Sequence, residues 1–206
     1  MPNIKIIVEE CLSKLVRAYE ADCENFLTES DVASSLSCLL KDKMKKQDVG
    51  EFRVHSGLRP YIEEDGKDAL VLRTEDSSSI EWKWKKHEPK NSGSVVDIVI
   101  VSKKRDYFEK AKDTSATILK KYWRLVTYPL EAFKVCIEVK IRVSGNIKRI
   151  KRDINKLRMI REANKDCLVY LIVADRRALP TSKENIKNCC EENDIPFYIA
   201  FLSHQT

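Results

Sequence analysis

The sequence is poor in the residues that interrupt regular structure. Among its 206 residues are only five glycines and six prolines, so long irregular linkers are not expected. Histidine is scarce as well: His55, His87 and His204 are too widely spaced to predict a zinc site. No run of eighteen apolar residues occurs, which argues against a membrane span.

The signatures of several enzyme classes are also absent. The chain contains no Walker A motif, no G-x-G-x-x-G loop, no G-x-S-x-G elbow and no H-E-x-x-H helix. Charged side chains at Lys5, Glu9 and Glu10 interrupt any signal-peptide core, so secretion is not expected. The seven cysteines are an odd number and form no C-x-x-C pair. They predict buried free thiols in a reducing, cytoplasmic compartment.

What the chain does contain is typical of a globular protein with its own core. Apolar residues make up 43% and charged residues 34% of the sequence, and the length suits one domain. The net charge of +6 is compatible with phosphate binding, although an ordinary soluble protein explains it equally well.

Hydrophobic periodicity predicts an alternation of helices and strands. Helical spacing is found over residues 4–24, 28–46, 106–123, 147–164 and 182–193. Strand patterns are found over residues 52–55, 69–73, 80–85, 95–101, 133–143, 167–174 and 196–202. This order predicts an α/β layer fold with a mixed sheet over residues 1–206, with residues 1–27 as an N-terminal helical extension and 103–131 as a helical insert.

The clearest strand, residues 133–143, carries an acid and an amine on one face. Every odd-numbered residue in it is apolar, so the alternation of a strand sends Glu138 and Lys140 to the opposite face, side by side. There the two side chains can reach one small site. Lys134 and Arg142 share the same face, however, and favour the alternative that this is only the solvated face of an edge strand.

A second acid lies where strands disfavour it. Asp97 interrupts the apolar run of residues 94–101, and a carboxylate in a covered sheet needs a cation or hydrogen-bond donors. A salt-bridged or strand-end aspartate would satisfy this need. A metal ion shared with Glu138 would satisfy it too.

Asp97 followed by Glu138-Val139-Lys140 resembles the motif of the PD-(D/E)xK nuclease superfamily. The resemblance implies a restriction-endonuclease-like fold, a three-layer α/β/α core with a mixed β-sheet. It also implies a site for Mg²⁺, with Mn²⁺ as a substitute, held by Asp97, Glu138 and the Val139 carbonyl. Lys140 would orient the attacking water or neutralise charge. Glu29, on the first core helix, would add a further acid, unless it is only a charge at a helix N-terminus.

The resemblance spans residues 28–174, and the site that it implies can form only if one structural condition is met. The strands that carry Asp97 and Glu138 are separated by the insert over residues 103–131, and they must still pair as neighbours for the site to exist. The residue before Asp97 is Val96 and not the proline of the motif, a departure that many family members share.

The helix over residues 147–164 presents a basic surface for nucleic acid. Its basic residues are Lys148, Arg149, Lys151, Arg152, Lys156, Arg158 and Arg161. We expect those of its first turns, Lys148, Arg149, Lys151 and Arg152, to contact DNA phosphates. An ordinary solvated amphipathic helix is the alternative.

The resemblance predicts a Mg²⁺-dependent DNA endonuclease of defence or repair. A restriction-like enzyme that cuts both strands is expected to be a symmetric homodimer. Two alternatives remain open. One is a non-catalytic nucleic-acid-binding or assembly module that retains the nuclease fold. The other is a structural protein in which Glu138 and Lys140 are only surface charges. The insert could clamp DNA, form a dimer interface or cover the sheet.

Overall fold

The computed structural model describes residues 3–64, 68–74, 80–84, 95–103, 127–141, 147–175 and 180–201. In chain order the elements are α1 (Ile4–Ala21), η1 (Cys23–Asn25), α2 (Glu29–Lys46), β1 (Phe52–Glu64), β2 (Asp68–Thr74), β3 (Ile80–Trp84), β4 (Val96–Ser102), β5 (Thr127–Pro129), η3 (Leu130–Ala132), β6 (Phe133–Ile141), α4 (Ile147–Ala163), β7 (Leu168–Asp175), α5 (Pro180–Glu192) and β8 (Phe197–Phe201). Within these ranges no helix is both long enough and apolar enough to cross a membrane.

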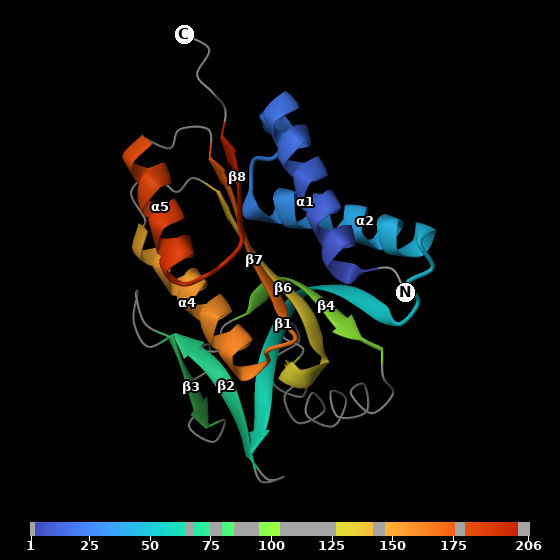
Figure 1. Cartoon of the computed structure of the whole chain (residues 1–206), viewed down its shortest axis with the longest axis vertical. Helices are drawn as coiled ribbons and strands as arrows, with labels where there is room; N and C mark the ends of the chain where they lie inside the picture. The colour runs from blue at the N-terminus through green and yellow to red at the C-terminus, as the bar shows by residue number, and fades with distance from the viewer. Residues whose placement is uncertain are drawn as a thin grey trace.

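The strands form one mixed sheet in the order β3-β2-β1-β4-β6-β7-β8, with β5 beside β1 (Figure 1). The pairs β1–β4 and β4–β6 are antiparallel, whereas β6–β7 and β7–β8 are parallel. Ile98 on β4 lies opposite Ile137 on β6. The two strands that carry the predicted site are therefore direct neighbours, and the condition set by the long insert is met.

Helices cover both faces of the sheet (Figure 1). Ile98 and Ile137 point to the face covered by α1 and α2, where they join one buried cluster. Val99 and Cys136, their neighbours along the strands, join a second cluster with α4 and α5. The predicted fold class, a three-layer α/β/α core with a mixed sheet, is thereby confirmed, and it is consistent with a restriction-endonuclease-like fold.

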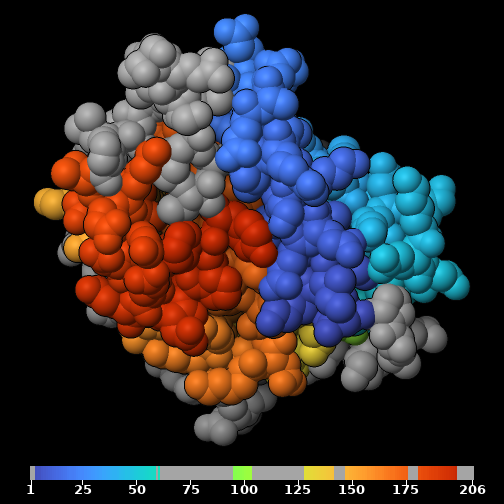
Figure 2. Space-filling model, turned by 45° about the horizontal axis from the view of Figure 1, so that its top comes forward, coloured from blue at the N-terminus to red at the C-terminus, as the bar shows by residue number. Residues whose placement is uncertain are grey.

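The N-terminal helix α1 packs into this core. Ile7 and Leu12 are buried in the same cluster as the strand residues beneath α2. Figure 2 shows α1 in blue lying against the C-terminal part of the chain in red, and the Tyr170 hydroxyl donates a hydrogen bond of 3.5 Å to Glu9 of α1. Helix α1, which lies within the predicted N-terminal extension, therefore covers the sheet.

Helix α2 begins where its sequence predicts. The Thr28 hydroxyl accepts a hydrogen bond of 3.2 Å from the Asp31 amide, and the Asp31 carboxylate accepts one of 2.7 Å from the Thr28 amide. This capping box satisfies two amides that the helix leaves free at its start. Because it fixes the first turn, it also fixes Glu29, the first residue of the helix.

The described end of the predicted insert contains a short strand. Within residues 103–131, the described residues after 126 form strand β5 and the start of the short 3-10 helix η3. Strand β5 pairs in parallel with β1, with Pro129 at its end opposite Tyr61. Proline has no backbone N–H group to donate to a neighbouring strand. It is tolerated at the end of a strand because that hydrogen bond is not required there. The predicted helix over residues 106–123 lies outside the described residues.

The alternation of β6 is broken once. Val135, Ile137 and Val139 share one face as predicted, the face that α1 and α2 cover, but Phe133 joins the cluster under α4 and α5. The register between β4 and β6 shifts between Ile100 and Val101, which places one extra residue in β6. A bulge of this kind reverses the face of every residue beyond it.

Candidate functional site

Asp97 and Glu138 meet on the face of the sheet that α4 covers. Asp97 precedes Ile98 on β4, and Glu138 follows Ile137 on β6, where those two residues are paired. Because successive side chains alternate, both acids leave the face occupied by the isoleucines. The Val139 amide donates a hydrogen bond of 2.8 Å to the Asp97 carboxylate, which ties the two strands together at this point.

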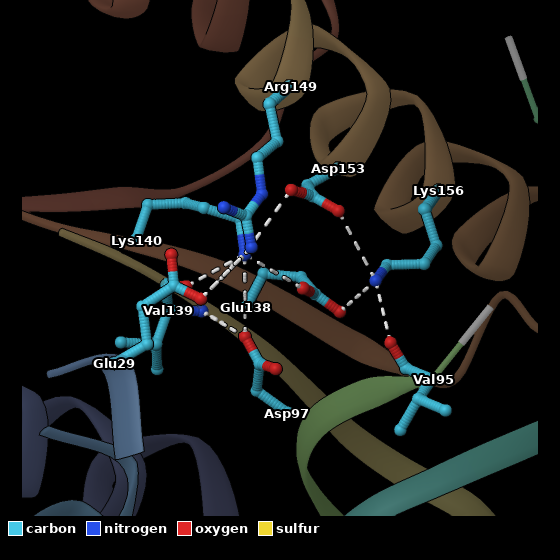
Figure 3. A network of polar contacts seen from close by, with 9 residues as sticks. All are labelled: Glu29, Val95, Asp97, Glu138, Val139, Lys140, Arg149, Asp153 and Lys156. Carbon is cyan, nitrogen blue, oxygen red and sulfur yellow. Dashed lines mark hydrogen bonds and ion pairs between the residues drawn. The ribbon is translucent and has the colours of Figure 1, made fainter. Parts of the chain in front are cut away.

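The Lys140 ammonium lies at the centre of the site (Figure 3). Its Nζ atom donates a hydrogen bond of 2.8 Å to the Val139 carbonyl oxygen. Four carboxylates surround the same atom, at 3.3 Å for Asp153, 3.7 Å for Asp97, 3.8 Å for Glu138 and 3.9 Å for Glu29. The structure therefore brings together Glu29, Asp97, Glu138, Val139 and Lys140, from three elements that are distant in sequence.

Two further site residues come from α4 and were missed in the sequence. Asp153 contacts Lys140. The Nζ atom of Lys156 lies 2.6 Å from Oε1 of Glu138. It also donates a hydrogen bond of 2.7 Å to the Val95 carbonyl oxygen. Asp153 and Lys156 themselves are 3.4 Å apart. Both side chains are buried, so the assignment of Lys156 to the exposed basic surface was wrong.

A signal for these residues was present in the helical periodicity. Arg149, Asp153 and Lys156 are spaced four and then three residues apart, so they lie along one side of α4. Each directly precedes a residue of the apolar stripe, Ile150, Ile154 and Leu157, all of which are buried. An acid and a base beside a buried stripe can turn toward the sheet only if the sheet offers them partners, and β6 does.

Glu138 is the most deeply buried of the four carboxylates around Lys140. Burial raises the pKa of this side chain above its usual range, with Asp97 and Asp153 adding to the effect and Lys156 and Lys140 opposing it. The contact of 2.6 Å with Lys156 favours the ionised form nonetheless. Glu138 Oε1 and Asp153 Oδ2 are buried and receive no hydrogen bond of regular geometry within the described chain, although ammonium groups lie close by. A further cation beside Glu138 would therefore stabilise its charge.

The two lysines remain charged in spite of their burial. Burial alone would lower the pKa of Lys140, but the carboxylates, Glu138 first, raise it to about 12. The pKa of Lys156 is raised for the same reason, again chiefly by Glu138 and Asp153. Both side chains are therefore ammonium ions at neutral pH, and neither is free to accept a proton.

The predicted nucleic-acid contacts divide into two groups. Arg149 reaches the site, because its guanidinium lies 3.3 Å from the Glu29 carboxylate while half of its side chain stays exposed. Lys148 and Lys151 are exposed and Arg152 is half-buried. Within the described part of the chain, none of these three forms an ion pair with the carboxylates of the site.

The donor atoms of the site are oxygens, which are the ligands that a hard divalent cation prefers. They are spaced too widely to bind such an ion directly in this conformation. Among the described residues, no three His, Cys, Asp or Glu side chains are spaced to hold a metal ion. The carboxylates stand 3.3–3.9 Å from an ammonium nitrogen, whereas Mg²⁺ binds oxygen at about 2.0–2.1 Å. The donors are nevertheless all oxygens, and Lys140 is a stand-in cation at the point where they converge. Glu29, Asp97, Glu138 and the Val139 carbonyl are the groups that could hold Mg²⁺.

Comparison with known proteins adds little to this geometry. No protein-family model matches the chain, and no curated protein matches it. Among solved structures, the cAAA-bound forms of NucC from P. aeruginosa ATCC27853 and E. coli MS115-1 are similar, at 11% and 10% sequence identity and TM-scores of 0.45 and 0.44. Each match covers 96% of this chain and 74% of the NucC chain. Similarity at this level assigns no function, which has to be inferred from the site itself.

Proposed function

We propose that this protein is a Mg²⁺-dependent endonuclease that hydrolyses phosphodiester bonds in DNA. One observation carries the proposal: Glu29, Asp97 and Glu138, from α2, β4 and β6, converge with the Val139 carbonyl on one cation position. Purely structural roles for surface charges do not require three acids from separate elements to face one point. A shell of carboxylate and carbonyl oxygens is the environment that Mg²⁺ prefers, and Mn²⁺ accepts the same ligands.

In this proposal Asp97, Glu138 and the Val139 carbonyl would hold the ion, and Glu29 would add a further carboxylate from the exposed side of the site. The chemistry that such an ion supplies when bound is a lowered pKa for a coordinated water and compensation of charge on the phosphoryl oxygens. The hydrogen bond from the Val139 amide holds Asp97 in place for this role.

Lys140 acts as a cation and hydrogen-bond donor. Because the carboxylates raise its pKa to about 12, its ammonium keeps its protons at neutral pH and cannot serve as a general base. With the ion at the point where the oxygens converge, Lys140 would lie beside it, orient the attacking water and offset the charge that develops on the phosphate.

The exposure of the site residues indicates the side from which DNA approaches. The side chains of Glu29, Asp97 and Arg149 are 29%, 31% and 50% exposed, whereas Glu138 and Lys140 are 1% and 6% exposed. The phosphodiester therefore enters beside Glu29 and Asp97. Arg149 stands at this entrance, with Lys148, Lys151 and Arg152 on the same turns of α4 as further phosphate contacts.

We place this activity in the cytoplasm, in the defence or repair of DNA. All seven cysteines are free thiols, which suits a reducing compartment. A symmetric homodimer would present two sites to the two strands of a duplex, and its mass in solution, measured by light scattering, tests this assembly.

Cleavage of supercoiled plasmid DNA tests the proposal. The wild-type protein should nick or linearise the plasmid with Mg²⁺ or Mn²⁺ and not with EDTA. Asp97→Asn and Lys140→Ala should lose this activity. Asp166→Asn is the matched control, because Asp166 is an exposed aspartate just before β7. Since β7 runs parallel to β6, Asp166 lies near the start of β6, away from Glu138 and Lys140.

Equal cleavage by all of these proteins would show that the residues are not the active site. Binding of DNA without cleavage, and without any Mn²⁺ binding, would favour the non-catalytic nucleic-acid-binding module instead.

A further inference from the structure

Helix α4 supplies the site with a second acid and amine that the nuclease motif does not contain. Asp153 and Lys156 lie one helical turn apart and turn inward, and both side chains are about 95% buried. Figure 3 shows them on the α4 side of Lys140 and Glu138, away from Glu29 and Asp97. Burying two charges is costly, so these side chains need a role that their mutual contact alone does not explain.

Lys156 contacts one of the two carboxylate oxygens of Glu138 and leaves the other to Lys140. Its Nζ atom lies 2.6 Å from Oε1, while Oε2 faces the Lys140 ammonium at 3.8 Å. Lys156 also donates to the Val95 carbonyl oxygen, immediately before the strand that carries Asp97. One ammonium thus fixes the rotation of the Glu138 carboxylate and links it to β4, so that Oε2 points to the position where Asp97 and Glu29 also point.

Asp153 holds Lys140 from the closed side of the site. Its carboxylate is the nearest of the four to Nζ, at 3.3 Å. The other three carboxylates belong to the proposed shell for the divalent ion, whereas Asp153 contacts the two lysines. When Glu29, Asp97 and Glu138 bind a divalent cation, Asp153 remains as a partner for the displaced ammonium.

We propose that Asp153 and Lys156 are positioning residues of this site: Lys156 orients Glu138 toward the cation, and Asp153 keeps Lys140 beside it. The inference rests on the proposed function, since it assumes that the shell binds a divalent ion. It extends that function to two residues on α4 that touch neither the ion nor the substrate.

The affinity for Mn²⁺, measured by electron paramagnetic resonance of the free ion in titrations without DNA, tests the role of Lys156. Lys156→Met removes a positive charge beside the shell, so electrostatics alone predicts tighter binding of a cation. Loss of the orienting contact predicts the opposite, a weakening of about tenfold or more, as for other partners of metal ligands. The sign of the change therefore separates the two. Tighter or unchanged binding by the folded variant would overturn the role of Lys156.

Arg158→Met is the matched control. Arg158 also lies on α4, but it is partly exposed and pairs with Glu162 and Asn155. The same change of residue type there should leave Mn²⁺ affinity unchanged, and a loss equal to that of Lys156→Met would point to a general effect on the helix and overturn the proposal.

Asp153→Asn provides a second, nearly isosteric variant whose fold is checked by circular dichroism. Without this carboxylate, Lys140 should compete more strongly for the shell, and Mn²⁺ affinity should fall. Adding Lys140→Met should restore the affinity, because the competing ammonium is then gone. A loss that is not restored indicates a merely structural role and overturns the role of Asp153.

Failure of this inference is distinct from failure of the proposed function. If wild-type protein binds no Mn²⁺ and cleaves no DNA, the proposed function is wrong and the inference falls with it. If wild-type protein binds Mn²⁺ and loses it with Asp97→Asn, but not with Lys156→Met or Asp153→Asn, only the inference is wrong.

Discussion

Replacing Lys156 with methionine should destabilise the fold by about 3–5 kcal/mol, the usual cost of removing one partner of a buried ion pair. The side chain is 4% exposed, and Glu138, its partner at 2.6 Å, is 1% exposed. After the substitution Glu138 keeps only the more distant Lys140, at 3.8 Å, and the Val95 carbonyl loses its bond to Lys156. Neither group can turn to water without opening the contact between α4 and the sheet.

The effects of the two substitutions should be less than additive when the partner is neutralised as well. Glu138→Gln alone should cost about 1–3 kcal/mol, because Lys156 retains Val95 and Asp153 as partners. The double variant Glu138→Gln/Lys156→Met no longer buries the charge of this pair. We expect it to be more stable than the sum of the single effects by about 1–3 kcal/mol, the range found for residues in contact.

Guanidinium unfolding followed by circular dichroism measures these differences. The slope of the unfolding free energy with denaturant should stay constant across the series, so that shifts of the midpoint report stability. Arg158→Met, which breaks an exposed pair on the same helix, should cost no more than about 1 kcal/mol. A loss below about 1 kcal/mol for Lys156→Met, or additive effects in the double variant, would refute the view that Lys156 and Glu138 form a tightly coupled buried pair.

Three further outcomes are expected elsewhere in the molecule. Arg149→Ala should weaken DNA binding, measured by fluorescence anisotropy at several salt concentrations, and lower the slope of log affinity against log salt by about 1; an unchanged slope would remove Arg149 from the DNA contact. Hydrogen bonds from Thr28 lower the pKa of Asp31, so its stabilising effect is present above its ordinary pKa and lost as the pH falls through the lowered value. Asp31→Asn should therefore lower the melting temperature at neutral pH and make it less sensitive to acid, and parallel curves for both proteins would contradict this. Finally, a thiol reagent should label the exposed Cys38 rapidly in the native protein and the buried Cys136, whose pKa is raised well above its usual range chiefly by burial, only on unfolding.

The sequence alone was sufficient wherever structure follows from neighbours along the chain. The Thr28 and Asp31 box sets the start of α2, since both partners lie within one helical turn. The period of two in β6 placed Glu138 and Lys140 on one face, and the apolar run around Asp97 predicted a buried strand. In each case the signal is a spacing of two to four residues, which the backbone geometry of a strand or helix converts directly into a direction.

Tertiary structure decided everything that depends on pairing across long separations. The bond between Asp97 and Val139 joins residues 42 positions apart, and the bond between Lys156 and Val95 joins residues 61 apart. No local pattern specifies such partners. The bulge that moves Phe133 to the other face likewise arises only from the register of β6 against β4.

The charged residues of β6 and α4 give the clearest example of what the sequence and the tertiary structure each decide. Glu138 and Lys140 could be predicted because their strand is regular, whereas Lys156 looked like one more basic residue on a solvated helix, equivalent to Arg158. Only the packing of α4 against β6 distinguishes them, burying Lys156 and leaving Arg158 partly exposed. A buried side chain keeps its charge only where groups of opposite charge surround it. For Lys156 these groups are set by the sheet that faces α4 and not by the sequence of α4 itself.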